Sequence, residues 1–157
     1  MISSNGRDYG THLPPLLKCV LMTDGPVLEL GCGEWSTPVL HALCLVSRRL
    51  FVSTETREDW AKQIGDSIGE KILCPPDLSA LAKYHWSVVL IDHDPVASRV
   101  PDALRLAEFA DFILIHDCQY PGIVDELAAV LDRWKYHFCY DSLWPPTMIL
   151  SNTREFL

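Results

Sequence analysis

The sequence has no apolar run of the roughly 18 residues that a transmembrane helix needs. Its first eleven residues are polar and do not form the apolar core of a secretory signal peptide. The chain also has no internal repeat, low-complexity segment or linker-like stretch. Because 157 residues can fill one hydrophobic core but not comfortably two, we expect residues 1–157 to form a single domain. From the missing transmembrane helix and signal peptide we expect a cytoplasmic location and no membrane partner.

Basic residues are scarce, with 13 Lys and Arg against 21 Asp and Glu, which makes the formal net charge −8. Arg48 and Arg49 form the only adjacent basic pair. Binding to a phosphate backbone relies on clustered Lys and Arg, so this composition disfavours a nucleic-acid partner. We therefore expect a small-molecule substrate.

The six cysteines include no CxxC pair, which disfavours both a zinc ribbon and a thioredoxin-like redox site. Most of them stand inside apolar runs, where a free cysteine behaves as a small hydrophobic residue. We predict reduced thiols in the core. The six are Cys19, Cys32, Cys44, Cys74, Cys118 and Cys139.

Short apolar runs alternate with segments of helical periodicity along the whole chain. The last two apolar runs have no room for a helix between them and should form an antiparallel hairpin around residues 144–146. The pattern predicts an α/β, Rossmann-like three-layer sandwich with a mostly parallel seven-stranded sheet and one antiparallel strand from the C-terminal hairpin. The expected strands are 27–30, 50–54, 71–74, 88–91, 112–115, 136–140 and 147–150, and the expected helices include 37–46, 77–84, 102–109 and 122–134.

Ligands of such sheets bind outside the carboxyl ends of the strands, so the residues after each strand are the candidates for a site. Gly31 and Gly33 follow the first strand and allow a tight turn that a ligand can approach closely. Glu55 follows the second strand, where a carboxylate can accept hydrogen bonds from both ribose hydroxyls. These three residues indicate a cofactor that contains a nucleoside.

The turn itself discriminates between two such cofactors. A dinucleotide places its pyrophosphate on the helix N-terminus, but Ser36 replaces the third glycine of that motif and Glu34 adds negative charge beside the bulk of Trp35. This disfavours an NAD-dependent oxidoreductase. S-adenosylmethionine has no phosphate and carries an ammonium and a sulfonium group, which Glu29 and Glu34 suit.

Residues 27–37, VLELGCGEWST, and 51–60, FVSTETREDW, resemble the first two motifs of class I S-adenosylmethionine-dependent methyltransferases. The resemblance implies that Glu29 meets the methionine amino group, directly or through water, and that Glu55 holds the ribose. By position, Asp77 after the third strand would reach the adenine amino group, although a role as helix N-cap is an equal alternative. Asp92, after the fourth strand, joins the expected cofactor-binding residues.

Residues 86–95, WSVVLIDHDP, and 110–122, ADFILIHDCQYPG, are similar to catechol O-methyltransferase and its small-molecule relatives. The resemblance implies magnesium ligands at Asp92 and Asp117. However, Cys118 replaces the third ligand, an asparagine, and Asp94 stands near the place of the catalytic lysine in those enzymes. We therefore expect transfer without a metal, and any divalent ion that binds should use Asp92 and Asp117 together.

Two histidines accompany these acids at the ends of neighbouring strands. We predict His93, His116 and Asp117 as catalytic residues, since a histidine with a carboxylate can act as a general base on a hydroxyl or bind a softer metal. Successive residues of an extended strand point to opposite faces, so His116 and Asp117 can meet only if the chain bends there.

The predicted activity is methyl transfer to a small-molecule acceptor, with a hydroxyl group favoured. The alternatives are a non-catalytic module on the same fold and, less favoured, the NAD-dependent oxidoreductase. Because few residues are available to cover the pocket, we also expect a homodimer that closes the site or packs along the sheet edge.

Overall fold

A computed structural model describes residues 10–74 and 78–157 of the chain. The strands are β1 (Val27–Leu30), β2 (Phe51–Thr54), β3 (Trp86–Ile91), β4 (Ala110–His116), β5 (Tyr136–Tyr140) and β6 (Thr147–Ser151). The helices are α1 (Leu13–Leu21), α2 (Ser36–Ser47), α3 (Glu58–Ile68), α4 (Arg99–Leu106) and α5 (Pro121–Ala128). Three short 3-10 helices complete the elements: η1 (Leu81–Lys83), η2 (Val96–Ser98) and η3 (Leu131–Arg133).

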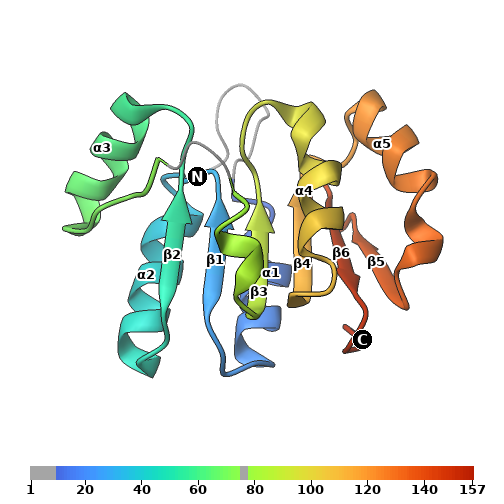
Figure 1. The fold of residues 1–157 in the computed structure, drawn as a ribbon, viewed down its shortest axis with the longest axis horizontal. Coiled ribbons are helices and arrows are strands. Elements are labelled where there is room, and N and C mark those ends of the chain that lie inside the picture. Colours follow the sequence, from blue (N-terminus) through green and yellow to red (C-terminus); the bar gives the residue numbers. More distant parts are fainter. Residues whose placement is uncertain (1–9, 75–77) are drawn as a thin grey trace.

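The strands form one sheet in the order β2-β1-β3-β4-β6-β5 (Figure 1). Strands β1 to β4 are parallel, whereas β6 pairs antiparallel with both β4 and β5. The mostly parallel sheet with one antiparallel strand from a C-terminal hairpin is therefore confirmed. Since β1 to β4 run the same way, their carboxyl ends meet at one edge, the upper one in Figure 1.

The seventh strand, predicted at residues 71–74, is not confirmed. Within the described residues this segment forms only a single parallel bridge, between Leu73 and Thr54. The Leu73 N–H donates to Ser53 O at 3.0 Å, and Leu73 O accepts from the Glu55 N–H at 2.9 Å. The sequence continues with two prolines, which lack the N–H that a longer ladder would need.

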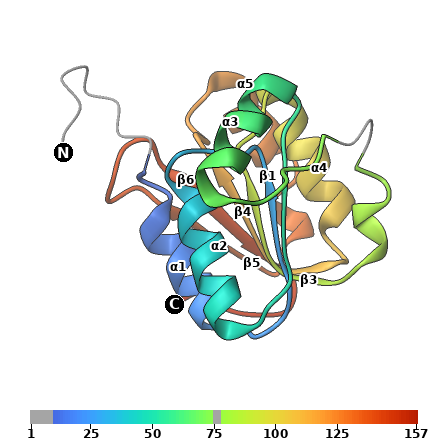
Figure 2. The same ribbon diagram turned by 90° about the vertical axis from the view of Figure 1, so that its left-hand side faces the viewer.

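Helices cover both faces of the sheet, as the three-layer prediction requires (Figure 2). On one face, α1 and α2 pack on alternate strand residues that include Val88, Phe112 and Leu114. On the opposite face, α4 and α5 pack on the intervening residues, which include Ile91 and Ile115. We call these the α1/α2 face and the α4/α5 face. This alternation decides where each polar residue at the strand ends points.

Several predicted helices differ from those in the structure at their ends. The helix expected at 122–134 is divided into α5 and η3, and the one expected at 102–109 begins three residues earlier as α4. Of the helix expected at 77–84, only η1 is present in the described part. Its proposed cap and adenine ligand, Asp77, lies outside the described residues. The longest described helix, α2, has 12 residues, too few for the roughly 20 of a membrane span.

All six cysteines are free thiols, and four of them are buried as predicted. Burial raises the pKa of the Cys19, Cys32 and Cys118 thiols to about 12, which keeps them protonated and poorly reactive. Cys74 and Cys139 are exposed, so the prediction of a core position is wrong for these two.

Candidate active site

The polar residues at the ends of β3 and β4 are divided between the two faces of the sheet. Leu90 and Leu114 pack on the α1/α2 face. Two residues later, Asp92 and His116 fall on the same face, because side chains alternate along a strand. By the same alternation His93 belongs to the α4/α5 face, whereas the backbone bends at Asp117, where φ is 54°.

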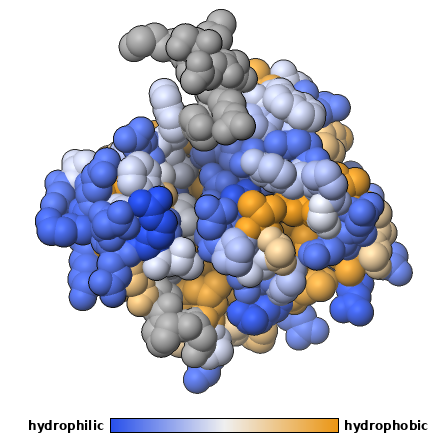
Figure 3. Space-filling model, turned by 90° about the horizontal axis from the view of Figure 1, so that it is seen from above, coloured by the Kyte–Doolittle hydropathy of each residue, from blue (hydrophilic) through white to orange (hydrophobic). Residues whose placement is uncertain are grey.

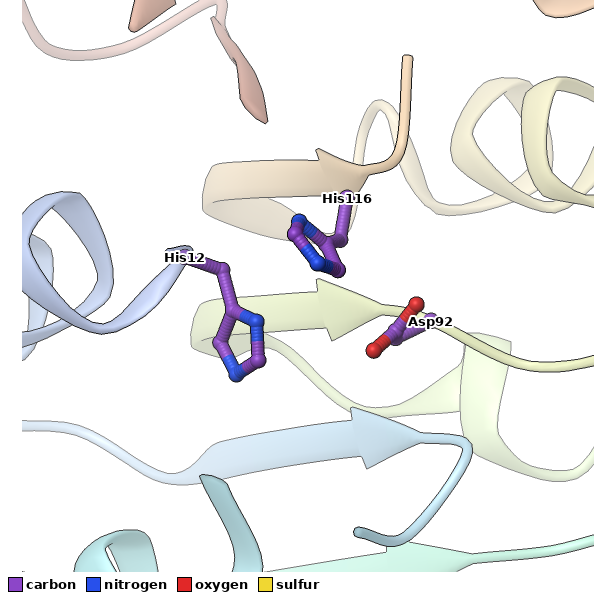
Figure 4. A group of neighbouring side chains, drawn as sticks. All are labelled: His12, Asp92 and His116. Atoms are coloured by element: carbon purple, nitrogen blue, oxygen red, sulfur yellow. The ribbon is translucent and has the colours of Figure 1, made fainter. Parts of the chain in front are cut away.

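A third residue, His12, joins Asp92 and His116 from the start of α1. The His12 and His116 rings meet edge to face, with centroids 4.5 Å apart and an angle of 66° between their planes. One potential ligand atom from each of the three side chains lies within 4.8 Å of the others. Figure 4 shows the three side chains directed toward one another, and we call this group the His–Asp cluster.

His116 is held as a neutral imidazole. The residue is 2% exposed, and burial lowers its pKa to about 4, with the nearby positive charge of Arg99 adding to the effect. Nδ1 lies 3.2 Å from the hydroxyl oxygen of Thr147 on β6, and Nε2 lies 4.0 Å from Asp117 Oδ1.

Asp92 forms an ion pair with Arg99, whose NH1 lies 3.0 Å from Oδ1. Burial raises the pKa of the Asp92 carboxyl to about 7, and the negative charges of Asp117 and Glu29 contribute, while Arg99 acts against the shift. A carboxyl with this pKa can exchange a proton near neutral pH, which is the property that a general base requires.

Arg99, which the sequence analysis did not single out, joins the ends of β3 and β4. Its side chain is buried at the start of α4. Nε donates to the carbonyl oxygen of His93 at 2.9 Å, and NH1 donates to that of His116 at 2.8 Å. NH1 also lies 3.8 Å from Asp117 Oδ2. One guanidinium thus faces two carboxylates and holds both strand ends together.

The structure places His93 away from the His–Asp cluster. Its Nε2 lies 2.9 Å from Asp102 Oδ2 on α4, and Asp102 Oδ1 accepts from Arg105 at 2.8 Å. Asp117 has the bend that the prediction required, with a φ of 54°, and its carboxylate lies between two neighbours: Oδ2 is 3.8 Å from Arg99 NH1 and Oδ1 is 4.0 Å from His116 Nε2. Of the three predicted catalytic residues, the structure brings only His116 together with Asp92.

The glycine turn after β1 has two positions with different demands. Gly31 has a φ of +96°, and a Cβ there would lie 2.6 Å from the backbone of Asp92 and His93. A glycine is therefore required at position 31, where the end of β1 closely approaches the end of β3. At Gly33 a Cβ would meet only the Ser36 hydroxyl, at 3.7 Å, so the space above this position is open.

Glu29 lies behind this turn, fully buried at the centre of β1. Its Oε2 accepts hydrogen bonds from Thr37 Oγ1 at 2.7 Å and from the Ser53 hydroxyl, and Thr37 Oγ1 in turn accepts from the Gly33 N–H at 2.8 Å. Burial raises the Glu29 pKa to about 7, which neighbouring hydroxyls partly offset. Oε1 is buried and has no hydrogen-bond partner among the described residues.

Two cavities flank the glycine turn. The first, about 280 Å³, contains Gly33, Trp35 and Trp60 together with His12 and Asp92 of the His–Asp cluster. The second, about 140 Å³, lies on the opposite side, and its lining includes Gly31, Thr54, Glu55, Leu78, His93 and Asp94. Figure 3 looks onto this end of the molecule, where the α3 side is mostly hydrophilic.

Glu55 has one carboxylate oxygen committed to the chain and one turned to the glycine turn. Oε1 accepts from the N–H groups of Thr56 and Arg57, at 2.7 and 3.0 Å, just before α3 begins. Oε2 accepts a longer hydrogen bond from the Cys32 thiol, with Sγ at 3.8 Å. Trp60 Nε1 donates to Cys32 O at 2.8 Å and braces the turn from α3.

Comparison with solved structures identifies the architecture. A human methyltransferase 10 domain containing protein superposes with a TM-score of 0.60 over 94% of this chain and 84% of its own, at 12% identity. The delta-N METTL16 MTase domain gives a TM-score of 0.55 over 93% of this chain and 84% of its own, at 13% identity. The fold is that of methyltransferase domains. No protein-family model matches the sequence, and no curated protein matches it either.

The methyltransferase-like fold confirms the Rossmann-like architecture expected from the motifs. The resemblance to catechol-type small-molecule enzymes gains no support from these two structures. At such low sequence identity, residue roles cannot be transferred from these structures, so the site of this chain is defined by its own geometry. Sequence reasoning did not assign His12, Arg99, Thr37 or Trp60 to the site. His12 and Trp60 contact it from distant parts of the chain, whereas Thr37 and Arg99 contact residues close in sequence.

Proposed function

We propose that the chain binds S-adenosylmethionine and transfers its methyl group to a hydroxyl of a small-molecule acceptor. The observation that carries this proposal is the glycine turn with a cavity on each side. Glu55 lies in one cavity, while Asp92 and His12 lie in the other. A fold shared with methyltransferase domains supports the same conclusion.

The described residues fit this cofactor. Glu55 can accept hydrogen bonds from the ribose hydroxyls, and Gly33 leaves open space where the chain of the cofactor would cross the turn. Glu34 lines the larger cavity and suits a positively charged group better than a pyrophosphate. Glu29 acts from behind the turn, where it orients Thr37 and through it the Gly33 N–H.

Once bound, S-adenosylmethionine supplies a methyl group on a sulfonium, which is already a good leaving group. The protein then has to align the acceptor and remove its proton. Asp92 lines the larger cavity beside His12, and its pKa of about 7 lets it accept a proton near neutral pH, while the neutral His116 lies next to both. These groups make a hydroxyl the acceptor that the site serves best.

Calorimetry with S-adenosylmethionine, S-adenosylhomocysteine and NAD tests the cofactor assignment. We expect both sulfur compounds to bind and Glu55→Gln to weaken them by about 10- to 100-fold, the value of hydrogen bonds to a charged group. Glu58→Gln, a change at an exposed residue near Glu55 in sequence, is the matched control and should bind as the wild type does.

Binding of NAD alone, or no binding of either sulfur compound at millimolar concentration, would contradict the proposal. Methyl-transfer turnover with a panel of hydroxyl, amine and thiol acceptors then tests the reaction. Cofactor binding without any turnover would instead favour a non-catalytic module on the same fold.

A further inference from the structure

We propose that His12, Asp92 and His116 bind one divalent transition-metal ion. The three side chains come from the start of α1 and the ends of β3 and β4, which are distant in sequence. Their potential ligand atoms already lie within 4.8 Å of one another. The fold alone brings these atoms together, in the orientation that Figure 4 shows.

The donor set determines the class of ion. Two imidazoles and one carboxylate are typical ligands of zinc, iron(II), manganese or cobalt, whereas magnesium prefers a shell of oxygens. The site therefore differs from the Asp92–Asp117 pair expected from sequence, because the ligand atoms grouped with Asp92 come from His12 and His116 and not from Asp117.

The present spacing requires only a small closure to form a complete site. Ligand atoms around one tetrahedral zinc ion lie about 3.3 Å apart, as follows from bonds of about 2.0–2.1 Å. From separations of at most 4.8 Å, the ligand atoms need to approach one another by no more than about 1.5 Å. His12 and His116 are both only 2% exposed, so their rings have few other positions to adopt.

Each of two ligands is already oriented by a neighbour. Thr147 Oγ1 lies 3.2 Å from His116 Nδ1, so that Nε2, which is 4.0 Å from Asp117 Oδ1, is the nitrogen left for a metal. Arg99 NH1 lies 3.0 Å from Asp92 Oδ1, and Oδ2 is the oxygen left for a metal. Such outer contacts are the usual support of metal ligands. The positive charge of Arg99 does not exclude a bound cation, because Asp117 Oδ2 lies 3.8 Å from the same guanidinium and supplies a second negative charge.

Three protein ligands leave open coordination positions toward the cavity that contains His12 and Asp92. If the proposed methyl transfer holds, an acceptor hydroxyl bound there would lose its proton more readily, because a metal ion stabilises the alkoxide. This consequence rests on the proposed function. The binding of the ion does not, and it can be measured without S-adenosylmethionine.

The test is calorimetry with Zn²⁺, Mn²⁺ and Co²⁺ on chelator-stripped protein that carries Cys74→Ser and Cys139→Ser, which removes the two exposed thiols. We expect one ion per chain, and at least 100-fold weaker binding in His12→Gln and His116→Gln. His137→Gln, a change at an exposed histidine on β5, is the matched control and should leave the affinity unchanged.

Asp92→Asn should also weaken binding at least 100-fold, whereas Asp117→Asn should change it less than tenfold. The reverse order of these two variants, or stoichiometric binding that survives the loss of either cluster histidine, would overturn the proposal. A measurement on the unaltered cluster guards against variants that fail to fold. Pulsed paramagnetic resonance of the Cu²⁺-loaded protein should detect two coordinated imidazoles, and the absence of imidazole nitrogen coupling would overturn the assignment.

Discussion

Glu29 shows how one residue can satisfy a sequence motif through a structural role. The motif places an acid in β1 beside the glycine turn, and the structure buries it completely, with Thr37 and Ser53 as its donors. A carboxylate in this position is costly to ionise, which raises its pKa to about 7. The protonation state of Glu29, which contacts the glycine turn through Thr37, therefore changes near neutral pH.

We predict that Glu29→Gln flattens the pH dependence of stability. The folded chain keeps the Glu29 proton up to a pH of about 7, whereas the unfolded chain releases it near 4.5, so the free energy of unfolding falls as pH rises through this window. The full effect is on the order of 3 kcal/mol. Urea denaturation at a series of pH values measures it, with Glu58→Gln as the control. Parallel curves for wild type and Glu29→Gln would contradict the prediction.

Strand ends are the elements on which the candidate site depends, and Arg99 at the start of α4 holds two of them. Its guanidinium donates to the backbone carbonyls that follow β3 and end β4 and pairs with Asp92. Buried charges contribute little net stability as a pair, but removal of one partner leaves the other uncompensated.

We expect Arg99→Met to lower the free energy of unfolding by about 3–5 kcal/mol, the usual cost of breaking a buried pair. Arg99→Lys should restore only part of it, because an ammonium cannot reproduce the fork that reaches both carbonyls. Chemical denaturation provides the measurement. Arg57→Met is the control: its pair with Asp59 is exposed, and the loss should be much smaller. Equal losses in the two variants would remove the role assigned to Arg99.

At the scale of the whole molecule, the predicted homodimer would help to cover the candidate site. The start of α1 and the hairpin turn are the two segments near it, and Thr11 Oγ1 donates to Pro145 O at 2.7 Å between them. Trp144, in that turn, is 64% exposed. A large exposed aromatic side chain is typical of an interface anchor.

We predict a homodimer that contacts through the Trp144 turn, measured by light scattering at micromolar concentration. Trp144→Glu should shift the chain to a monomer, because a charge cannot be desolvated at the centre of an interface. Val46→Glu, at the end of α2 far from the strand carboxyl ends, changes an even more exposed apolar residue and should leave the assembly intact. A monomeric wild type at high micromolar concentration would contradict the prediction.

The sequence by itself determined the sheet, the helices on its two faces and the glycine turn, because these depend on local periodicity and on residue types with narrow conformational preferences. The sequence also predicted a strand at residues 71–74, because the run is apolar, but only Leu73 pairs with a neighbouring strand. A run of four residues carries little periodicity, and the ladder that would extend it depends on a neighbouring strand.

The tertiary structure alone decided which polar residues meet. His93 and Asp92 are adjacent in sequence, yet one pairs with Asp102 on α4 and the other approaches His12. Spacing identified Asp92 and His116 as residues at strand ends, but the packing of α1 on one face selected their partner. Contacts between side chains more than 75 positions apart follow from the order of the strands and the side chosen by each helix, which no local pattern encodes.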